Sequence, residues 1–284
     1  MQTIPAPLVA PLFNPATFAI PGAVDTLLKR LRDDYPLSQA EVPGYDRHWI
    51  VTRHADIQFV SRQNELFHNA DRSATVAPIA GEELVRHFTD GDYNLFRSLV
   101  QLDGEEHKAH RKVLMLPLAP RSVADMETRM RASVKEEVDK LARADGSIDF
   151  VEAIATSYPL HVVMDTIGVP RKDHPEMLKL TQWLFSWGDP DLMRPGSDPT
   201  SPEQQAATWK IVFDRFDDYF SELIEQRRAD PKADFATAIA NAEIDGGPMQ
   251  HSRAISYFAI LATAGHDSTA HLSLIHISEP TRLC

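Results

Sequence analysis

The sequence predicts a mainly α-helical protein with a small β element near its N-terminus. From Asp103 onward, apolar residues recur at three- and four-residue spacing, which is typical of helices that bury one face. Residues 48–52 (HWIVT) instead combine β-branched and aromatic side chains, which indicates a strand. The uncharged run from Ala254 to Gly265 is shorter than the roughly 20 apolar residues that span a bilayer. It therefore predicts a long helix, over residues 249–271, at the centre of the fold.

Composition restricts the class of protein. Of 284 residues, 43% are hydrophobic and 25% charged, as in soluble globular proteins. A formal charge of −12 argues against a nucleic-acid partner, because no basic surface is available to meet phosphates. The first residues lack the basic start of a signal peptide, and the one cysteine, Cys284, excludes an internal disulfide. We expect a cytoplasmic protein without a membrane partner.

The N-terminal third is predicted to alternate short elements with irregular chain. Residues 1–22 contain five prolines and should form an extended surface arm. A helix is predicted over residues 23–34, the strand over 48–52, and a second helix over 53–67. Residues 68–100 show poor periodicity, so we expect an irregular segment that forms part of a binding wall.

The next helix begins with a capping signal. Asp103 can cap it, Glu106 can reach back to the cap, and the helix should end near Leu116. His107 and Arg111 are four residues apart and so project from one face. Two such donors can hold an anion, but a solvated surface explains them equally well.

The remaining helices follow from apolar spacing and from proline and glycine breaks. Ser122 is predicted to cap a long helix whose apolar stripe, including Val123, Val134 and Val138, packs in the core. Residues 183–187 are predicted to supply a second binding wall. No clean linker divides the chain, so we expect one domain. Further helices are predicted over residues 149–168, 175–187, 203–228 and 233–242.

The central helix breaks two rules at adjacent places. Gly265 costs roughly 1 kcal/mol against alanine within a helix, and a buried Asp267 carboxylate needs a partner. Two such violations together indicate a functional site. A structural explanation stays open, in which Gly265 ends one helix and Asp267 caps the next.

Four segments, in this order, carry a family resemblance: HWIVTRHADI, LDGEEHKAHRKVL followed by APRSV, YPLHVVMDTIGVP, and ATAGHDST. Together they resemble the soluble bacterial cytochromes P-450, which are haem-thiolate monooxygenases. The resemblance covers roughly residues 20–272 and is greatest to the group that hydroxylates terpene alcohols. It implies haem b as cofactor, dioxygen as oxidant, a small hydrophobic substrate and a ferredoxin-type electron donor.

The resemblance also assigns roles to the residues singled out above. His107 and Arg111 match the pair that holds the haem propionates, for which a guanidinium fork is suited. Ala264 and Gly265 match the small pair at the haem face, where a missing side chain leaves room for dioxygen.

The resemblance assigns proton delivery to the residues that directly follow this small pair and His266. Asp267 and Ser268 match the acid–alcohol pair, and Thr269 is expected to share the role. The family usually has threonine at the position of Ser268. Serine lacks the methyl group that restricts χ1, so its hydroxyl should be aimed less firmly.

The C-terminal residues depart from the family. Its iron ligand is a cysteine thiolate in a glycine-rich loop, whereas Cys284 follows no such loop. Residues 273–284 (SLIHISEPTRLC) resemble translated sequencing-adapter sequence. We therefore hypothesise that residues 1–272 are the N-terminal part of one cytochrome P-450 domain and that 273–284 are a foreign tail. Such a chain lacks the axial cysteine and should be inactive, and it should leave Phe258 and Leu261 uncovered.

Two other functions compete with the monooxygenase. One is a non-catalytic helical fragment or binding module. The other is a metal-dependent phosphohydrolase marked by the doublet His266-Asp267. A metal site of that kind needs further ligands, and no additional aspartate follows Asp267.

Overall fold

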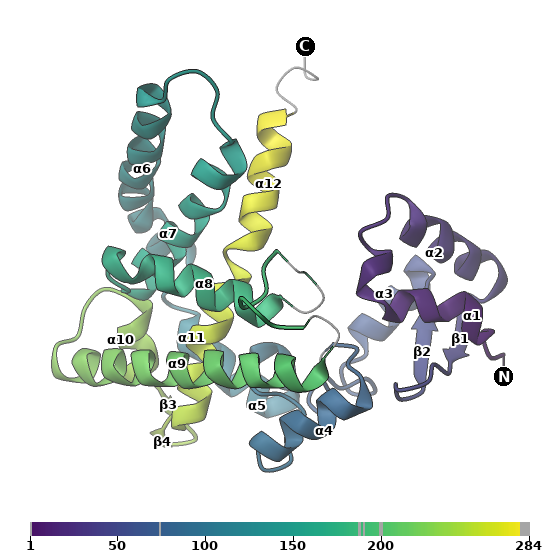
Figure 1. Ribbon diagram of the computed structural model, residues 1–284. Coiled ribbons are helices and arrows are strands. Elements are labelled where there is room, and N and C mark those ends of the chain that lie inside the picture. The colour runs from purple at the N-terminus through teal and green to yellow at the C-terminus, as the bar shows by residue number, and fades with distance from the viewer. Residues whose placement is uncertain (1, 74, 187–188, 190, 199–200, 279–284) are drawn as a thin grey trace. The chain divides into compact units, whose positions relative to one another are not determined.

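A computed structural model describes residues 2–73, 75–186, 189, 191–198 and 201–278, so the predictions for Trp187 and Cys284 lie outside it. The described fold is mainly helical with a small antiparallel sheet near the N-terminus, as predicted, and it has a second two-stranded sheet that was not predicted (Figure 1). The chain forms two compact units, each described by itself. Unit 1 comprises Met1–Leu95, Val100–Glu106 and Gln182–Val212, and unit 2 comprises Phe96–Leu99, His107–Thr181 and Phe213–Cys284.

Unit 1 holds the N-terminal elements and the first small sheet. The sheet pairs β1 with β2, with Leu37 opposite Val51. The elements are α1 (Ala6–Val9), the 3₁₀ turns η1 (Ala10–Phe13) and η2 (Pro15–Thr17), α2 (Ala23–Asp34), β1 (Leu37–Ala40), β2 (His48–Val51), α3 (His54–Arg62) and α4 (Ile79–Phe88). The 3₁₀ turn η3 (Leu99–Gln101) crosses the division between the units.

Two predictions for unit 1 were wrong. The proline-rich arm forms short helical turns rather than extended chain, because proline is tolerated in the first turn of a helix. Ile4 and Val9 from this arm are buried with Leu31, so the arm belongs to the core. Within residues 68–100, α4 forms where irregular chain was expected, because Gly81 and scattered charges hid its apolar face.

Unit 2 holds most of the helices and the second sheet. Strands β3 and β4 flank a turn at Asp245, which has a positive φ of 52°. The elements are α5 (Gly104–Arg111), η4 (Lys112–Leu114), α6 (Pro120–Arg143), η5 (Val151–Ala155), α7 (Ser157–Ile167), η6 (Arg171–Asp173), α8 (His174–Phe185), α9 (Pro202–Ala229), α10 (Phe235–Ala240), β3 (Glu243–Ile244), β4 (Gly247–Pro248), α11 (His251–Ala264) and α12 (Asp267–Ser278). The first residues of α5 and α9 and the end of α8 belong to unit 1.

The core of unit 2 forms around α11, as the uncharged run predicted. Phe258 is fully buried, and its ring stacks on Phe220 of α9 with centroids 4.3 Å apart. The expectation that Phe258 would be left uncovered was therefore wrong. None of the described helices combines the length and apolar character needed to cross a bilayer.

Helix α6 turns a different face inward than the sequence predicted. Val123, Val134 and Val138 of the apolar stripe are exposed, whereas Ser133 and Glu137 are buried. The helix packs against α7, where His161 lies 4.0 Å from Glu137, and Arg171 of η6 donates to Ser133. Ser122 does not cap the helix, since α6 begins at Pro120.

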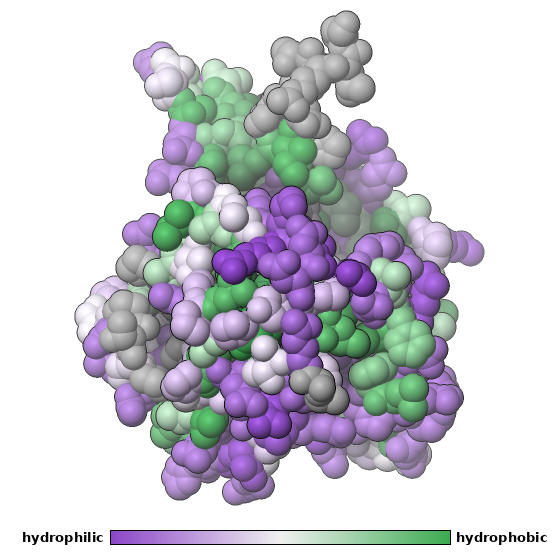
Figure 2. Space-filling model, turned by 90° about the vertical axis from the view of Figure 1, so that its right-hand side faces the viewer, coloured by the Kyte–Doolittle hydropathy of each residue, from purple (hydrophilic) through white to green (hydrophobic). Residues whose placement is uncertain are grey.

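Figure 2 shows that apolar residues, in green, also lie on the surface that faces the viewer.

The predicted central helix is two helices. α11 ends at Ala264, and α12 begins at Asp267, so Gly265 and His266 form the break. α12 then continues to Ser278, beyond the point where the helical pattern was expected to stop. The interruption puts the chain's acid and hydroxyl residues on the first turn of a new helix.

Candidate active site

The junction between α11 and α12 brings the small pair and the hydroxyl together. Ser268 Oγ donates to the carbonyl of Ala264 at 3.1 Å, across the break. Ala264, Ser268 and Thr269 are all exposed. The hydroxyl is thus tied to the end of α11, and the structure does not join it to the Asp267 carboxylate within the described contacts.

Gly265 is required by packing. A Cβ atom at this position would lie 2.7 Å from Cγ2 of Val163 on α7, well inside van der Waals contact. Its φ of −89° is ordinary, so the constraint is space rather than backbone conformation. The glycine lets α7 approach the junction closely.

His266 lies between two acceptors. Its Nε2 is 2.8 Å from the carbonyl oxygen of Thr156, and its Nδ1 is 3.0 Å from Asp267 Oδ1. The ring is only 3% exposed. Burial by itself lowers the pKa of His266, but the hydrogen bonds to Asp267 and Thr156 outweigh it and raise that pKa above its ordinary value.

Asp267 is held in its charged form. The hydrogen bond from His266 lowers the pKa of the Asp267 carboxyl, against a smaller opposing effect of burial. The carboxylate lies on the first turn of α12, where the helix dipole also favours a negative charge.

His107 and Arg111 lie on α5, with His107 half-buried and Arg111 exposed. The helix is tied to α11 by Tyr257, whose hydroxyl donates to the carbonyl of His110 and whose ring stacks on that of His110. Tyr257 precedes Ala264 by seven residues, about 10 Å along a helix. The helix that carries the two donors is therefore joined, at His110, to the helix that ends at the junction.

The donor pair fits the propionate groups of a haem. Among the described contacts, neither His107 nor Arg111 has a hydrogen bond or an ion pair, so both are available for an anion. A guanidinium and an imidazole one turn apart suit a carboxylate. An axial thiolate is not found in the part of the chain that the structure describes, because the sequence's single cysteine lies outside it.

The phosphohydrolase hypothesis gains no support from these residues. Within the described ranges, no three histidine, cysteine, aspartate or glutamate side chains converge as metal ligands. His266 uses both ring nitrogens on Thr156 and Asp267, which leaves no lone pair for a metal ion.

Known proteins resemble the chain closely over most of its length. Cytochrome P450-terp from a Pseudomonas species is 34% identical over 271 residues, which are 95% of this chain and 63% of that protein. The solved structure of CYP108D1 from Novosphingobium aromaticivorans matches with a TM-score of 0.80 at 30% identity, over 95% of this chain and 62% of that one. Over 95% of its length the chain is similar to proteins of the cytochrome P450 family.

A steroid C26-monooxygenase from Mycolicibacterium smegmatis is 28% identical over 88% of this chain and 55% of that protein. The chain spans less than two thirds of the length of these P450 relatives. No family model matches it.

Sequence reasoning missed the partners that hold the junction between α11 and α12. The doublet His266-Asp267 drew attention only as a metal motif, although adjacent acid and base already suggested an ion pair. Nothing in the sequence marks the Thr156 carbonyl, since any residue type supplies one. Val163 lacked a signal too, because it is one of many apolar residues in α7.

Proposed function

We propose that this chain is the N-terminal part of a haem-dependent monooxygenase that hydroxylates a small hydrophobic substrate with dioxygen and two electrons. The observation that carries the proposal is the interrupted helix, where Asp267 and Ser268 follow directly on Ala264 and Gly265. Residues 1–272 would form the family part of the chain, and 273–284 the foreign tail. Because the chain spans less than two thirds of its relatives, activity is proposed for the longer protein.

The chain's own residues would act in two places. His107 and Arg111 would hold the propionates of haem b by charge-assisted hydrogen bonds. Haem, when bound, would supply the activation of dioxygen. Asp267 would exchange protons at its carboxylate oxygens and Ser268 at Oγ, with Thr269 Oγ1 as a second hydroxyl.

The substrate class is supported by a relative and by composition. The relative named a steroid C26-monooxygenase acts on a steroid, a largely apolar molecule. We propose that residues 70–100 and 183–187 contribute apolar walls, in keeping with the apolar lining of small-molecule sites. A ferredoxin-type protein is the proposed electron donor, and we propose a cytoplasmic location.

Haem titration of the 284-residue chain tests the proposal. We expect binding that weakens about tenfold or more when His107 and Arg111 are both replaced by alanine, because each charge-assisted hydrogen bond contributes about 1.5–3 kcal/mol. The matched control is Arg143→Ala, which removes an exposed arginine from α6 and should leave the affinity unchanged. Equal affinities for the double variant and the control would contradict the assignment.

The spectrum of the carbon monoxide complex gives a second readout. We expect no red-shifted thiolate Soret band from this chain, since its one cysteine follows no glycine-rich loop. Observation of that band would show that the chain supplies its own thiolate and would refute the fragment hypothesis.

A further inference from the structure

We infer that His266 is a positioning residue for Asp267: held between the Thr156 carbonyl and the Asp267 carboxylate, it fixes the acid at the start of α12. The inference rests on the proposed function, because it gives Asp267 its proton-delivery role. His266 itself is a bridge between two segments, since Thr156 immediately precedes α7 and Asp267 begins α12.

The hydrogen-bond inventory determines the charge of the ring. A backbone carbonyl can only accept, and an ionised carboxylate can only accept. With acceptors at 2.8 Å from Nε2 and 3.0 Å from Nδ1, both ring nitrogens must carry hydrogen, as they do in the imidazolium form. A buried cation needs a compensating charge, and the Asp267 carboxylate supplies it.

The junction is anchored by two consecutive residues. Gly265 packs against Val163 of α7, and the next residue, His266, reaches the Thr156 carbonyl just before that helix. The α11–α12 break is therefore fastened to one neighbouring helix by a steric contact and a hydrogen bond. A backbone fixed in this way lets the following carboxylate occupy a defined place.

Asp267 then has two different oxygens. Oδ1 is engaged by His266, whereas Oδ2 has no partner among the described contacts, and the side chain is 60% exposed. His266 can thus hold the carboxylate through one oxygen and leave the other for proton exchange with solvent. The charged neighbours of Asp267 are His266 and, on the next turn of α12, His271, while the η5–α7 side contributes the neutral Thr156 carbonyl.

The first experiment measures the charge of His266 in the intact 284-residue chain. Histidines labelled with ¹⁵N distinguish the imidazolium from either neutral tautomer by chemical shift. At neutral pH we expect both nitrogens of His266 to be protonated, and a pKa above the ordinary histidine value. Asp267→Asn should lower that pKa by about one unit or more, a tenfold loss of proton affinity, because the negative charge is removed and burial is then opposed only by the hydrogen bond to the Thr156 carbonyl.

The reciprocal experiment follows the acid. Carboxyl ¹³C shifts should show that the Asp267 pKa rises in His266→Gln, which retains a donor for Thr156 but cannot carry charge. The matched control is His271→Gln, an exposed histidine on the same helix, which should leave the His266 charge state unchanged and alter the Asp267 pKa less.

A single neutral tautomer of His266, or a pKa no different from that of an unfolded chain, would overturn the inference. So would an Asp267 pKa that is equal in His266→Gln and in the unaltered chain. Haem affinity is a separate measurement: its failure refutes the proposed function, whereas a neutral His266 refutes only the positioning role.

Discussion

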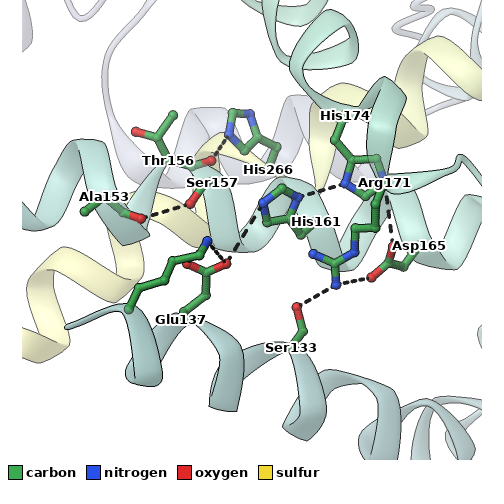
Figure 3. A network of polar contacts seen from close by, with 11 residues as sticks. Ser133, Glu137, Ala153, Thr156, Ser157, His161, Asp165, Arg171, His174 and His266 are labelled. Atoms are coloured by element: carbon green, nitrogen blue, oxygen red, sulfur yellow. Dashed lines mark hydrogen bonds and ion pairs between the residues drawn. The ribbon is translucent and has the colours of Figure 1, made fainter. Parts of the chain in front are cut away.

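His266 contacts the turn before α7, whereas His161 on α7 pairs with His174 at the start of α8, and the pKa values of these two histidine centres are shifted in opposite directions. His266, near the start of the helix, has a raised pKa because both nitrogens face acceptors. His161, on α7, and His174, the first residue of α8, have lowered pKa values, chiefly because burial disfavours their charged forms. Figure 3 shows both centres, with His266 beside Thr156 and His161 beside His174.

The partners explain the difference. His174 is completely buried, its Nε2 donates to the carbonyl of Val169 at 3.1 Å, and its Nδ1 lies 2.8 Å from Nδ1 of His161. The lowered pKa of His174 favours its neutral form, and because the one hydrogen of that form is on Nε2, facing the Val169 carbonyl, Nδ1 of His174 accepts from Nδ1 of His161. Arg171 adds a positive charge that further disfavours protonation of either ring.

The comparison teaches that burial alone does not determine the charge of a histidine. Glu137 and Lys140 face His161 from α6, but Glu137 is occupied by Lys140 at 2.7 Å and is 4.0 Å from the ring. Asp165 pairs with Arg171 at 2.6 Å and is 3.7 Å from His174. Each carboxylate near this centre is engaged elsewhere, whereas Asp267 is bound to His266 alone within the described contacts.

The largest expected effect comes from Gly168→Ala at the C-terminal end of α7. This helix carries His161 and directly follows Thr156, the partner of His266. Gly168 has a φ of +103°, and an added Cβ would lie 2.3 Å from Asp234 Oδ2 within the buried pair of Asp234 and Arg227. We expect a loss of about 3 kcal/mol in the free energy of unfolding, measured by urea denaturation. Gly146→Ala, at φ +80° with nothing within 4 Å, is the control and should cost about 1 kcal/mol. Equal losses of stability in the two variants would show that the overlap with the Asp234–Arg227 pair contributes nothing.

His174→Phe should have the next largest effect. The substitution keeps a ring in the fully buried site but leaves the Val169 carbonyl and His161 Nδ1 without their partner, at a cost of about 2 kcal/mol. The control is His251→Phe, which breaks an exposed pair with Asp217 and should cost less than about 1 kcal/mol. A stability equal to that of the unaltered chain would mean that the pair of histidines is dispensable.

Gly265→Ala tests the packing beside the charged centre. The new methyl group would overlap Val163 and should destabilise the chain by about 1–2 kcal/mol. The double variant Gly265→Ala, Val163→Ala should recover much of this loss, which a double-mutant cycle measures as coupling. Additive effects would place the cost of Gly265→Ala elsewhere than at this contact.

A change of pH should alter the stability contributed by the two centres in opposite directions. This is the smallest of the expected effects, because each unit of pKa shift changes the free energy of unfolding by at most about 1.4 kcal/mol. The lowered pKa values of His161 and His174 give stability that is present above the unfolded value of 6.5 and is lost as pH falls through the folded values. The raised pKa of His266 gives stability that is present below 6.5 and is lost as pH rises through its folded value.

Urea midpoints across pH 5 to 9 measure these slopes. His174→Phe should flatten the acidic side of the profile, and His266→Gln the alkaline side. If both variants flattened the same side, the opposite assignment of charge to the two centres would be wrong.

Local signals predicted much of the fold. The apolar spacing predicted α2 with its bounds Ala23–Asp34, and the HWIVT run predicted β2. The inward face of α6 could not be predicted, because Glu137 and Ser133 are buried by partners from α7 and the chain after it. The residues of the α11–α12 junction carried a sequence signal, but their positioning partner Thr156 lies 110 residues away and acts through its backbone.

The turn η5 has a further consequence for the register of α7. It is a π-helical turn, closed by a hydrogen bond from Thr156 N to the carbonyl of Val151 at 2.9 Å, and so holds one residue more than an α-helical turn. Each residue in a helix turns the chain by about 100°. Deletion of Ala153 should therefore restore an ordinary turn and rotate the Thr156 carbonyl relative to the chain before it. We therefore expect this one extra residue to determine the direction of the Thr156 carbonyl, to which His266 donates.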